Sequence, residues 1–175
     1  MSKIAIFFGP QGGAVNRVAD KIRDAIGPEK VEMVPIKDAT FADIDKYDKI
    51  IFGISTVGSE TWHATYSNPD WGKFLPEITK TRYEGKTIAI FGLGDHVTYS
   101  RTFVDHIGLL ARDLLKNGAE LSGKVPTDQY EFDDSKAIDK DGKFMGLPVD
   151  EDFEPELTDE RVKNWVEQIR PDFGF

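Results

Sequence analysis

Short, wholly apolar runs alternate along this chain with segments whose apolar residues recur at helical spacing. The first run, Ile4–Phe8, contains no polar side chain, as expected of a parallel strand covered on both faces. The next segment repeats apolar residues every three or four positions as far as Ile26, and Gly27-Pro28 ends it. Further strands are predicted over Val31–Val34, Ile50–Ile54 and Thr87–Phe91. Strands that alternate with helices predict an α/β fold, in which a right-handed parallel sheet carries helices on both faces.

The sequence predicts three more helices. Asn68 and Pro69 suit the N-cap and the first position of one helix. Apolar residues from Phe103 onward mark a second helix, which ends at Asn117-Gly118. Thr158 is predicted to cap the last helix, because acidic residues follow it at the positive end and apolar residues then recur at helical spacing.

The second half of the chain contains one break in this rhythm. A fifth strand is expected to begin near Ala119, but the polar segment Val125–Phe144 interrupts it. The apolar stretch Phe144–Val149 then returns as a strand, so the sequence predicts a fifth strand split by an inserted loop. A solvated loop without function is an equal alternative for the insertion. Because no repeat and no long linker divides the chain, we expect one domain over residues 1–175.

Charge and composition exclude several classes of function. The chain has 31 acidic and 22 basic residues and a formal net charge of −9, which disfavours nucleic-acid binding and favours basic protein partners. The absence of cysteine excludes disulfides, thiolate metal sites and iron–sulfur clusters. The start of the chain lacks a signal-peptide pattern and no apolar run has membrane-spanning length, so we expect a cytoplasmic protein without membrane association.

Ligands of open parallel sheets bind beyond the carboxyl ends of the strands. The segment Gly9–Val15 follows the first strand and leads into a helix, so its backbone N–H groups can form an anion site. It matches neither the dinucleotide nor the P-loop fingerprint. Ser55–Gly58 follows the third strand. The segment after the fourth strand can present the carboxylate of Asp95 to the edge of a planar heterocycle while Tyr99 covers its face.

Several segments of the second half have a specific pattern. They are Phe91-Gly92-Leu93-Gly94-Asp95 with Tyr99, Ile107-Gly108, Pro126–Ala137, Gly142–Leu147, Asp150-Glu151-Asp152 and Leu157–Val166. With them the chain resembles the long-chain flavodoxins over essentially its whole length. The resemblance implies a flavodoxin-like three-layer sandwich with a five-stranded parallel sheet of order 2-1-3-4-5 and an insertion in the fifth strand. It also implies one non-covalently bound FMN.

The resemblance implies a role for individual residues. Tyr99 stacks on the outer face of the flavin ring, and Asp95 accepts a hydrogen bond from the ring N3–H while neighbouring loop amides meet the ring oxygens. The peptide of Gly58 reorients with the redox state, Thr56 meets the ribityl chain or the phosphate, and Asp150 lies near the ribityl side. The full set of expected cofactor-binding residues is Gly9, Pro10, Gln11, Gly12, Gly13, Ala14, Val15, Ser55, Thr56, Val57, Gly58, Gly92, Leu93, Gly94, Asp95, Tyr99 and Asp150.

The phosphate loop departs from the family pattern. Flavodoxins usually carry three hydroxyl side chains there, and the aligned residues Pro10, Gly12 and Val15 have none. The backbone and the helix terminus remain as donors, and replacement side chains could come from Gln11, Asn16 or Ser55. Losing several hydrogen bonds to a charged group should weaken the hold on the phosphate.

The function that the resemblance implies is that of a low-potential one-electron carrier without substrate turnover of its own. The implied partners are a flavodoxin reductase, a 2-oxoacid oxidoreductase or a nitrogenase reductase, and a monomer is expected. The alternative is a flavodoxin-fold binding or regulatory module that has lost FMN, which the phosphate loop would explain. A receiver-type signalling domain is disfavoured because Phe8-Gly9 and Gly53-Ile54 supply none of the acidic residues it needs. Neither a hydrolase motif nor metal-ligand spacing of histidines is present in the sequence.

Overall fold

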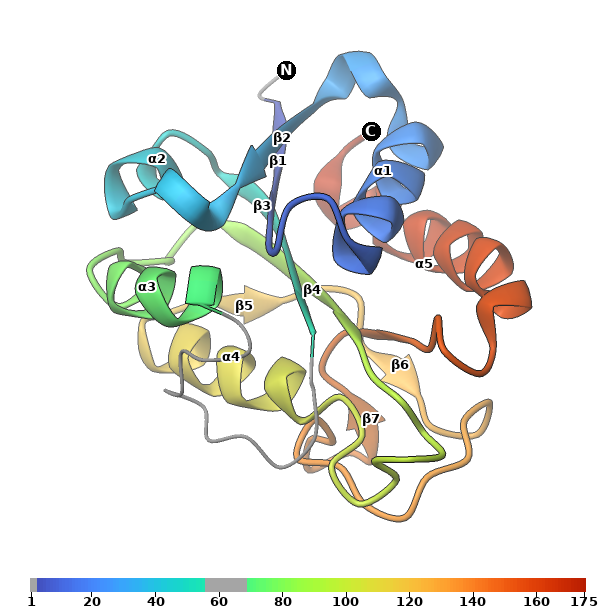
Figure 1. The fold of residues 1–175 in the computed structure, drawn as a ribbon. Coiled ribbons are helices and arrows are strands. Elements are labelled where there is room, and N and C mark those ends of the chain that lie inside the picture. Colours follow the sequence, from blue (N-terminus) through green and yellow to red (C-terminus); the bar gives the residue numbers. More distant parts are fainter. Residues whose placement is uncertain (1–2, 56–68) are drawn as a thin grey trace.

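A parallel β-sheet forms the centre of the molecule (Figure 1). The computed structural model describes residues 3–55 and 69–175. The strands have the order β2-β1-β3-β4-β5, with β8 also paired to β4, which confirms the predicted order. Their bounds are Ile4–Phe8 (β1), Val31–Pro35 (β2), Lys49–Ser55 (β3), Thr87–Leu93 (β4), Glu120–Leu121 (β5) and Leu147–Val149 (β8).

Helices cover both faces of the sheet. The helices α1 (Ala14–Ile26) and α5 (Thr158–Phe173) lie on one face, and α3 (Pro69–Ile78) and α4 (Asp105–Lys116) lie on the other with the short α2 (Phe41–Asp45) (Figure 1). Each face has its own apolar core, and all five residues of β1 are buried because both of its sides are covered. The three-layer sandwich is confirmed, and it supports our proposal of one domain over residues 1–175.

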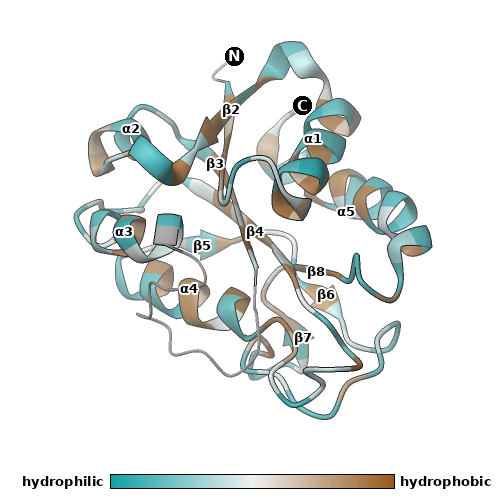
Figure 2. Ribbon diagram, in the orientation of Figure 1, coloured by the Kyte–Doolittle hydropathy of each residue, from teal (hydrophilic) through white to brown (hydrophobic). Residues whose placement is uncertain are grey.

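The hydropathy of each element matches its position in these layers. Brown, apolar residues run through the central strands, while the helices carry brown and teal in alternate stretches (Figure 2). On α1 the buried side chains recur every three or four residues and face the sheet; they are Val15, Val18, Ala19, Ile22 and Ile26. Burial of this apolar stripe, worth about 25 cal/mol per Å² of apolar surface, holds the helix on the sheet.

The fifth strand is split as predicted. β4 pairs with β5 at Thr87–Ile88 and with β8 at Phe91–Leu93, and the insertion lies between these two pairings in the sequence. Within the insertion, β6 (Val125–Pro126) and β7 (Lys143–Phe144) form an antiparallel pair.

The insertion is packed against the domain instead of extending into solvent as a bare loop. The rings of Tyr130 and Phe132 both lie 5.2 Å from that of Phe144, and Phe132 stacks on Phe103 at 5.7 Å. Phe103 and Phe144 are almost completely buried. An aromatic cluster therefore joins the insertion to the start of α4, and each such ring pair adds about 1 kcal/mol beyond burial.

Two predicted helix starts are wrong. α4 begins at Asp105 and not at Phe103, because the backbone of Phe103 is bonded to the insertion: its N–H donates to Asp134 O at 3.3 Å and its carbonyl accepts from Ser135 Oγ at 2.5 Å. Val104, which lies between Phe103 and the first residue of α4, has a left-handed backbone, with φ of 47°. Thr158 is the first residue of α5 and not its N-cap, since its hydroxyl donates to Glu151 at 2.6 Å. Asn68 lies outside the described residues.

Candidate functional site

The loops predicted to form the site begin at one edge of the sheet. In the parallel register Phe8 lies beside Gly53, and Leu93 lies beside both Ser55 and Val149. The carboxyl ends of β1, β3, β4 and β8 therefore lie at the same edge of the sheet, where ligands of such sheets bind. This brings together all the predicted site residues that the structure describes. Thr56, Val57 and Gly58 lie outside the described residues.

The loop after β1 is held by one backbone hydrogen bond to β3 and by one side chain. Gly9 is buried and donates to Gly53 O at 3.4 Å, whereas Pro10 and Gln11 are exposed. Gly12 has φ of +87°, a conformation that favours glycine, and its N–H donates to Asn16 Oδ1 at 2.9 Å. The loop therefore has a defined shape without any of the family's hydroxyl groups.

The start of α1 presents backbone N–H groups at this loop. Gly13 is the N-cap, and in the described part of the chain no side chain caps it. The first N–H groups of a helix lack acceptors within the helix and, with the helix dipole, favour an anion. Ala14 is half-buried and Val15 packs into the core, so Val15 can contribute only its backbone. A Cβ added at Gly13 would meet no described atom within 4 Å, which shows open space beside the helix end.

Asn16 supports the loop, and both polar atoms of its side-chain amide have partners. Its Oδ1 accepts from Gly12, and its Nδ2 lies 3.4 Å from Asp20 Oδ2. Gln11, Asn16 and Ser55 were the candidates to replace the missing hydroxyl donors, and of these Asn16 uses its side chain to shape the loop. Ser55 ends β3 and its carbonyl accepts from His106 Nδ1 at 2.9 Å, which ties the end of this strand to α4.

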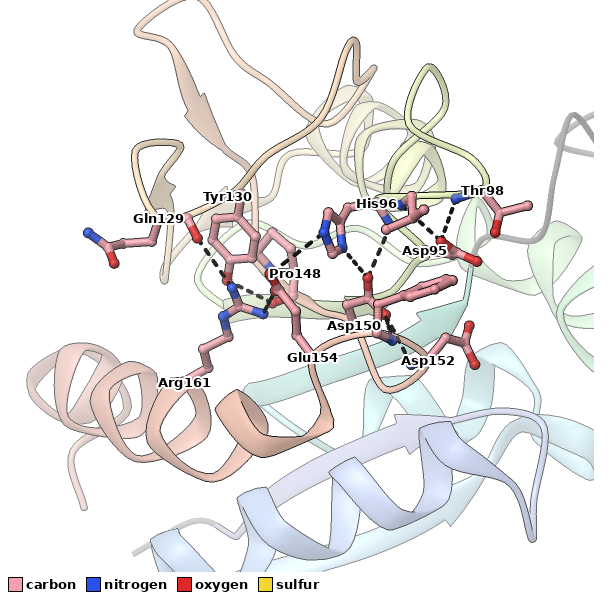
Figure 3. A network of polar contacts seen from close by, with 12 residues as sticks. Asp95, His96, Thr98, Gln129, Tyr130, Pro148, Asp150, Asp152, Glu154 and Arg161 are labelled. Carbon is pink, nitrogen blue, oxygen red and sulfur yellow. Dashed lines mark hydrogen bonds and ion pairs between the residues drawn. The ribbon is translucent and has the colours of Figure 1, made fainter.

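The loop after β4 is shaped by Asp95. Gly92 and Leu93 are buried in the sheet, and Gly94 donates to Val149 O at 3.0 Å. The Oδ1 atom of Asp95 accepts from the backbone of Val97 at 2.9 Å and of Thr98 at 2.7 Å (Figure 3). The carboxylate of Asp95 therefore closes a tight turn. The two amides that it binds, those of Val97 and Thr98, belong to the loop whose amides were expected to bond the ring oxygens.

Tyr99 is the exposed aromatic residue of this loop. Its N–H donates to Asp95 O at 3.2 Å, and 38% of the residue is exposed. A half-exposed ring at the carboxyl edge is placed to cover a planar ligand. The ring-binding roles of Asp95 and Tyr99 remain predictions.

Asp150 lies at the edge but is fully occupied by the protein. It is 0% exposed, and its Oδ2 accepts from His96 N at 3.1 Å and His96 Nδ1 at 2.5 Å. Its Oδ1 accepts from Asp152 N at 3.0 Å and Phe153 N at 2.9 Å. Burial by itself raises the pKa of Asp150, but these hydrogen bonds outweigh burial and hold the pKa below its usual value. Asp150 is predicted to lie near the ribityl side. Because a carboxylate offers about four acceptor positions, a direct contact with a ligand there would have to displace a present partner.

The surroundings of this loop are acidic. Burial raises the pKa of Asp152, and the charges of Asp150, Asp95 and Glu151 raise it further. Such a cluster disfavours any additional negative charge nearby. In the ranges 3–55 and 69–175, no three or more metal-binding side chains come together, and none of the helices has the length and apolarity needed to cross a membrane.

Sequence reasoning missed His96 as part of the site, since the histidines were considered only as metal ligands. The signal was its position directly after Asp95. Its partner Asp150 is 54 residues away, so the pairing becomes visible only in the fold.

Comparisons with known proteins agree with this geometry. Residues 6–165 match the family model described as Flavodoxin. The chain is 37% identical to the flavodoxin of a Nostoc species over 173 residues, which cover 99% of this chain and 98% of that protein. It is also 37% identical to flavodoxin 1 of Azotobacter vinelandii over 177 residues, covering 99% and 98% of the two chains. The structure of a Fusobacterium nucleatum flavodoxin bound to flavin mononucleotide has the same fold, with a TM-score of 0.87, 24% identity and 99% coverage of each chain.

Proposed function

Because this chain belongs to the flavodoxin family, we propose that it binds FMN non-covalently and acts as a low-potential carrier of single electrons between redox enzymes. When bound, FMN supplies the redox centre that takes up and releases the electrons. The chain itself would bind the phosphate, hold the ring and set the charge around it. The proposal rests mainly on the position of the Gly9–Gly13 loop and the Asp95–Tyr99 loop at the same edge of the sheet.

The residues at this edge fit the parts of FMN. The phosphate suits the start of α1, where the helix terminus is positive and the Cβ position of Gly13 is open. The ring suits the loop that carries Tyr99, whose side chain is half-exposed. Thr56, Val57 and Gly58, which follow β3 in the sequence, stay predicted members of the site. We retain Asp150 in the site as a support for the ring loop.

The acidic residues around the loop after β4 support a low potential. Burial and the charges of Asp150, Asp95 and Glu151 raise the pKa of Asp152, so the region already resists further negative charge. Adding an electron to a ring beside them costs more than in water, which lowers the reduction potential. The alternative of a binding module without FMN gains no support from the family comparisons, and the protein is proposed to lack substrate turnover of its own.

Titration of FMN into the apoprotein tests the proposed function. We expect saturable binding of one FMN, seen as a change in its visible absorption and a loss of its fluorescence. Replacing Tyr99 by alanine should weaken binding at least about fivefold, since stacking contributes about 1 kcal/mol beyond burial and the burial of the ring is lost as well. Tyr99→Phe, which keeps the ring, is the matched control and should bind like the wild type. A wild-type apoprotein that takes up no FMN would contradict the carrier function.

The net charge predicts how partners dock. With a formal net charge of −9, the protein should be steered toward basic patches on partners such as a flavodoxin reductase, a 2-oxoacid oxidoreductase or a nitrogenase reductase. Stopped-flow rates of its reduction by a basic reductase should fall severalfold as salt is raised, because the screening length drops to about 8 Å at physiological ionic strength. Rates that stay constant, or that rise steadily with salt, would count against steering. A monomer and a cytoplasmic location stay predictions.

A further inference from the structure

The imidazole of His96 lies between two carboxylates that come from outside its own loop. Its Nδ1 is 2.5 Å from Asp150 Oδ2, and its Nε2 is 3.7 Å from Glu154 Oε1. The rings of Phe103 and Phe153 meet it edge-on at 6.4 and 6.2 Å. Only 15% of the His96 side chain is exposed. The ring is therefore fixed in position by polar contacts at both nitrogens and by aromatic contacts at its sides.

Asp150 turns this contact into a link between two segments. One carboxylate oxygen accepts from the backbone and the ring of His96, and the other accepts from the amides of Asp152 and Phe153. The loop after β4 is thus tied to the turn after β8 through a single buried carboxylate (Figure 3). Since the pKa of Asp150 is lowered, this carboxylate is ionised at neutral pH and Nδ1 carries the proton that it donates.

The far side of His96 is supported by α5 and by the insertion. Glu154 Oε2 lies 2.8 Å from Arg161 Nη1, and Arg161 Nη2 donates to Gln129 O at 3.2 Å. The guanidinium lies 4.2 Å from the centre of the Tyr130 ring, and Tyr130 in turn donates to Pro148 O at 2.7 Å. Figure 3 shows this row of contacts leading from α5 to the loop after β4. The carboxylate that faces His96 Nε2 is therefore itself held in place.

From these contacts we propose that His96 is a positioning residue of the flavin site: its N–H to Asp150 holds the Gly94–Tyr99 loop in the shape that receives the flavin ring. This inference rests on the proposed binding of FMN. His96 adjoins Asp95, and the backbone of Asp95 binds Tyr99, so a displacement of His96 moves both residues expected at the ring. His96 itself does not contact the flavin in this role.

Loss of the N–H should loosen the loop and lower the fraction of protein ready to bind. Apparent affinity falls in proportion to that fraction. The loss of one hydrogen bond to a charged group corresponds to a decrease of about tenfold or more. Because riboflavin and FMN share the ring and differ at the phosphate, both flavins should lose affinity by the same factor.

Two substitutions separate the hydrogen bond from the bulk of the side chain. His96→Leu removes the donor at similar size, whereas His96→Asn keeps an N–H at the position of Nδ1. We expect His96→Leu to weaken FMN and riboflavin binding equally, by about tenfold, and His96→Asn to restore most of the affinity. In the apoprotein, amide hydrogen exchange at Val97, Thr98 and Tyr99 should speed up in the leucine variant and return toward the wild-type rate in the asparagine variant.

The other outcomes overturn the proposal. Affinities and exchange rates that are the same in all three proteins would show that His96 does not position the loop. A loss confined to FMN would place the effect at the phosphate instead of the ring. If His96→Leu does not fold, His96→Gln replaces it in the experiment. Glutamine moves the donor to the place of Nε2, so the same loss of flavin affinity is expected. A wild-type protein that binds neither flavin would overturn both this inference and the proposed function, and differs from the other results because the wild type itself fails.

Discussion

Replacing Gly108 by alanine should lower the free energy of unfolding by about 2 kcal/mol, although alanine is the better helix former. In an exposed helix the change would stabilise by about 1 kcal/mol. Here a Cβ at Gly108 would lie 2.0 Å from Lys136 O, 2.5 Å from Lys136 C and 2.8 Å from the Cα of Ala137. These are backbone atoms, which cannot move aside like the end of a flexible side chain, so either α4 or the insertion must shift.

The contact is costly to relax because the same segment is bonded to α4 at several points. Lys136 N donates to Asp105 Oδ1 at 2.7 Å, and Arg112 Nη2 donates to Lys136 O at 3.0 Å. Forced overpacking of a buried contact costs about 1–3 kcal/mol, and the strained hydrogen bonds add to it. We therefore expect the steric term to exceed the gain in helix propensity.

Chemical and thermal unfolding measure this change. Gly13→Ala is the control, since a Cβ at Gly13 meets no described atom within 4 Å. Alanine is a poorer N-cap than glycine but restricts the unfolded chain, so these two effects oppose each other and the stability should change by less than about 1 kcal/mol. A Gly108→Ala variant as stable as the wild type would show that the insertion does not press on α4 as closely as the structure indicates.

The sheet could be predicted because its strands are apolar on both sides. Ile4–Phe8 has the predicted bounds, whereas β3 and β4 extend beyond the predicted runs to Ser55 and Leu93. The short α2 was missed, although Thr40 and Asp43 form a capping box that the sequence contains. Local patterns therefore predicted the elements with long apolar signals and left out a five-residue helix.

The errors occur where a residue binds a segment outside the predicted helix. Phe103 has a helical pattern, but its backbone bonds to the insertion more than thirty residues later, as the separation of 32 from Ser135 shows. Thr158 looks like an N-cap, yet its hydroxyl binds Glu151. Asp150 stays a predicted site residue, but the sequence did not show that its carboxylate already accepts four hydrogen bonds from His96 and from its own turn. Local propensity and residue spacing cannot predict such hydrogen bonds, because they form only once other segments of the fold are in place.

Replacing Gly13 by serine should raise the preference of the protein for FMN over riboflavin by about tenfold. The two flavins differ at the phosphate, so the ratio of their affinities measures what the phosphate loop contributes. In the wild type this ratio should be smaller than in flavodoxins with hydroxyl groups in the loop, because Pro10, Gly12 and Val15 supply none. One added hydrogen bond to the charged phosphate corresponds to about 1.5 kcal/mol, or roughly tenfold.

The structure decides where a hydroxyl can be added. Gly12 has φ of +87°, so threonine at this position would be strained, and Val15 is buried in the core. Gly13 has an extended backbone, with φ of −111°, and open space at its Cβ. As the N-cap of α1, a serine there can accept from the first turn of the helix and still donate its hydroxyl proton to the phosphate.

Calorimetric titration of both flavins into apoprotein measures the ratio, with Gly13→Ala as the control for the added Cβ. The alanine variant should keep the wild-type ratio, since it supplies no donor. Equal ratios in the serine and alanine variants would mean that the hydroxyl does not reach the phosphate. A wild-type ratio as large as that of a hydroxyl-bearing loop would instead mean that another donor already takes this place. Gln11, which is exposed within the loop, would then be the first candidate, since Asn16 is engaged by Gly12 and Asp20.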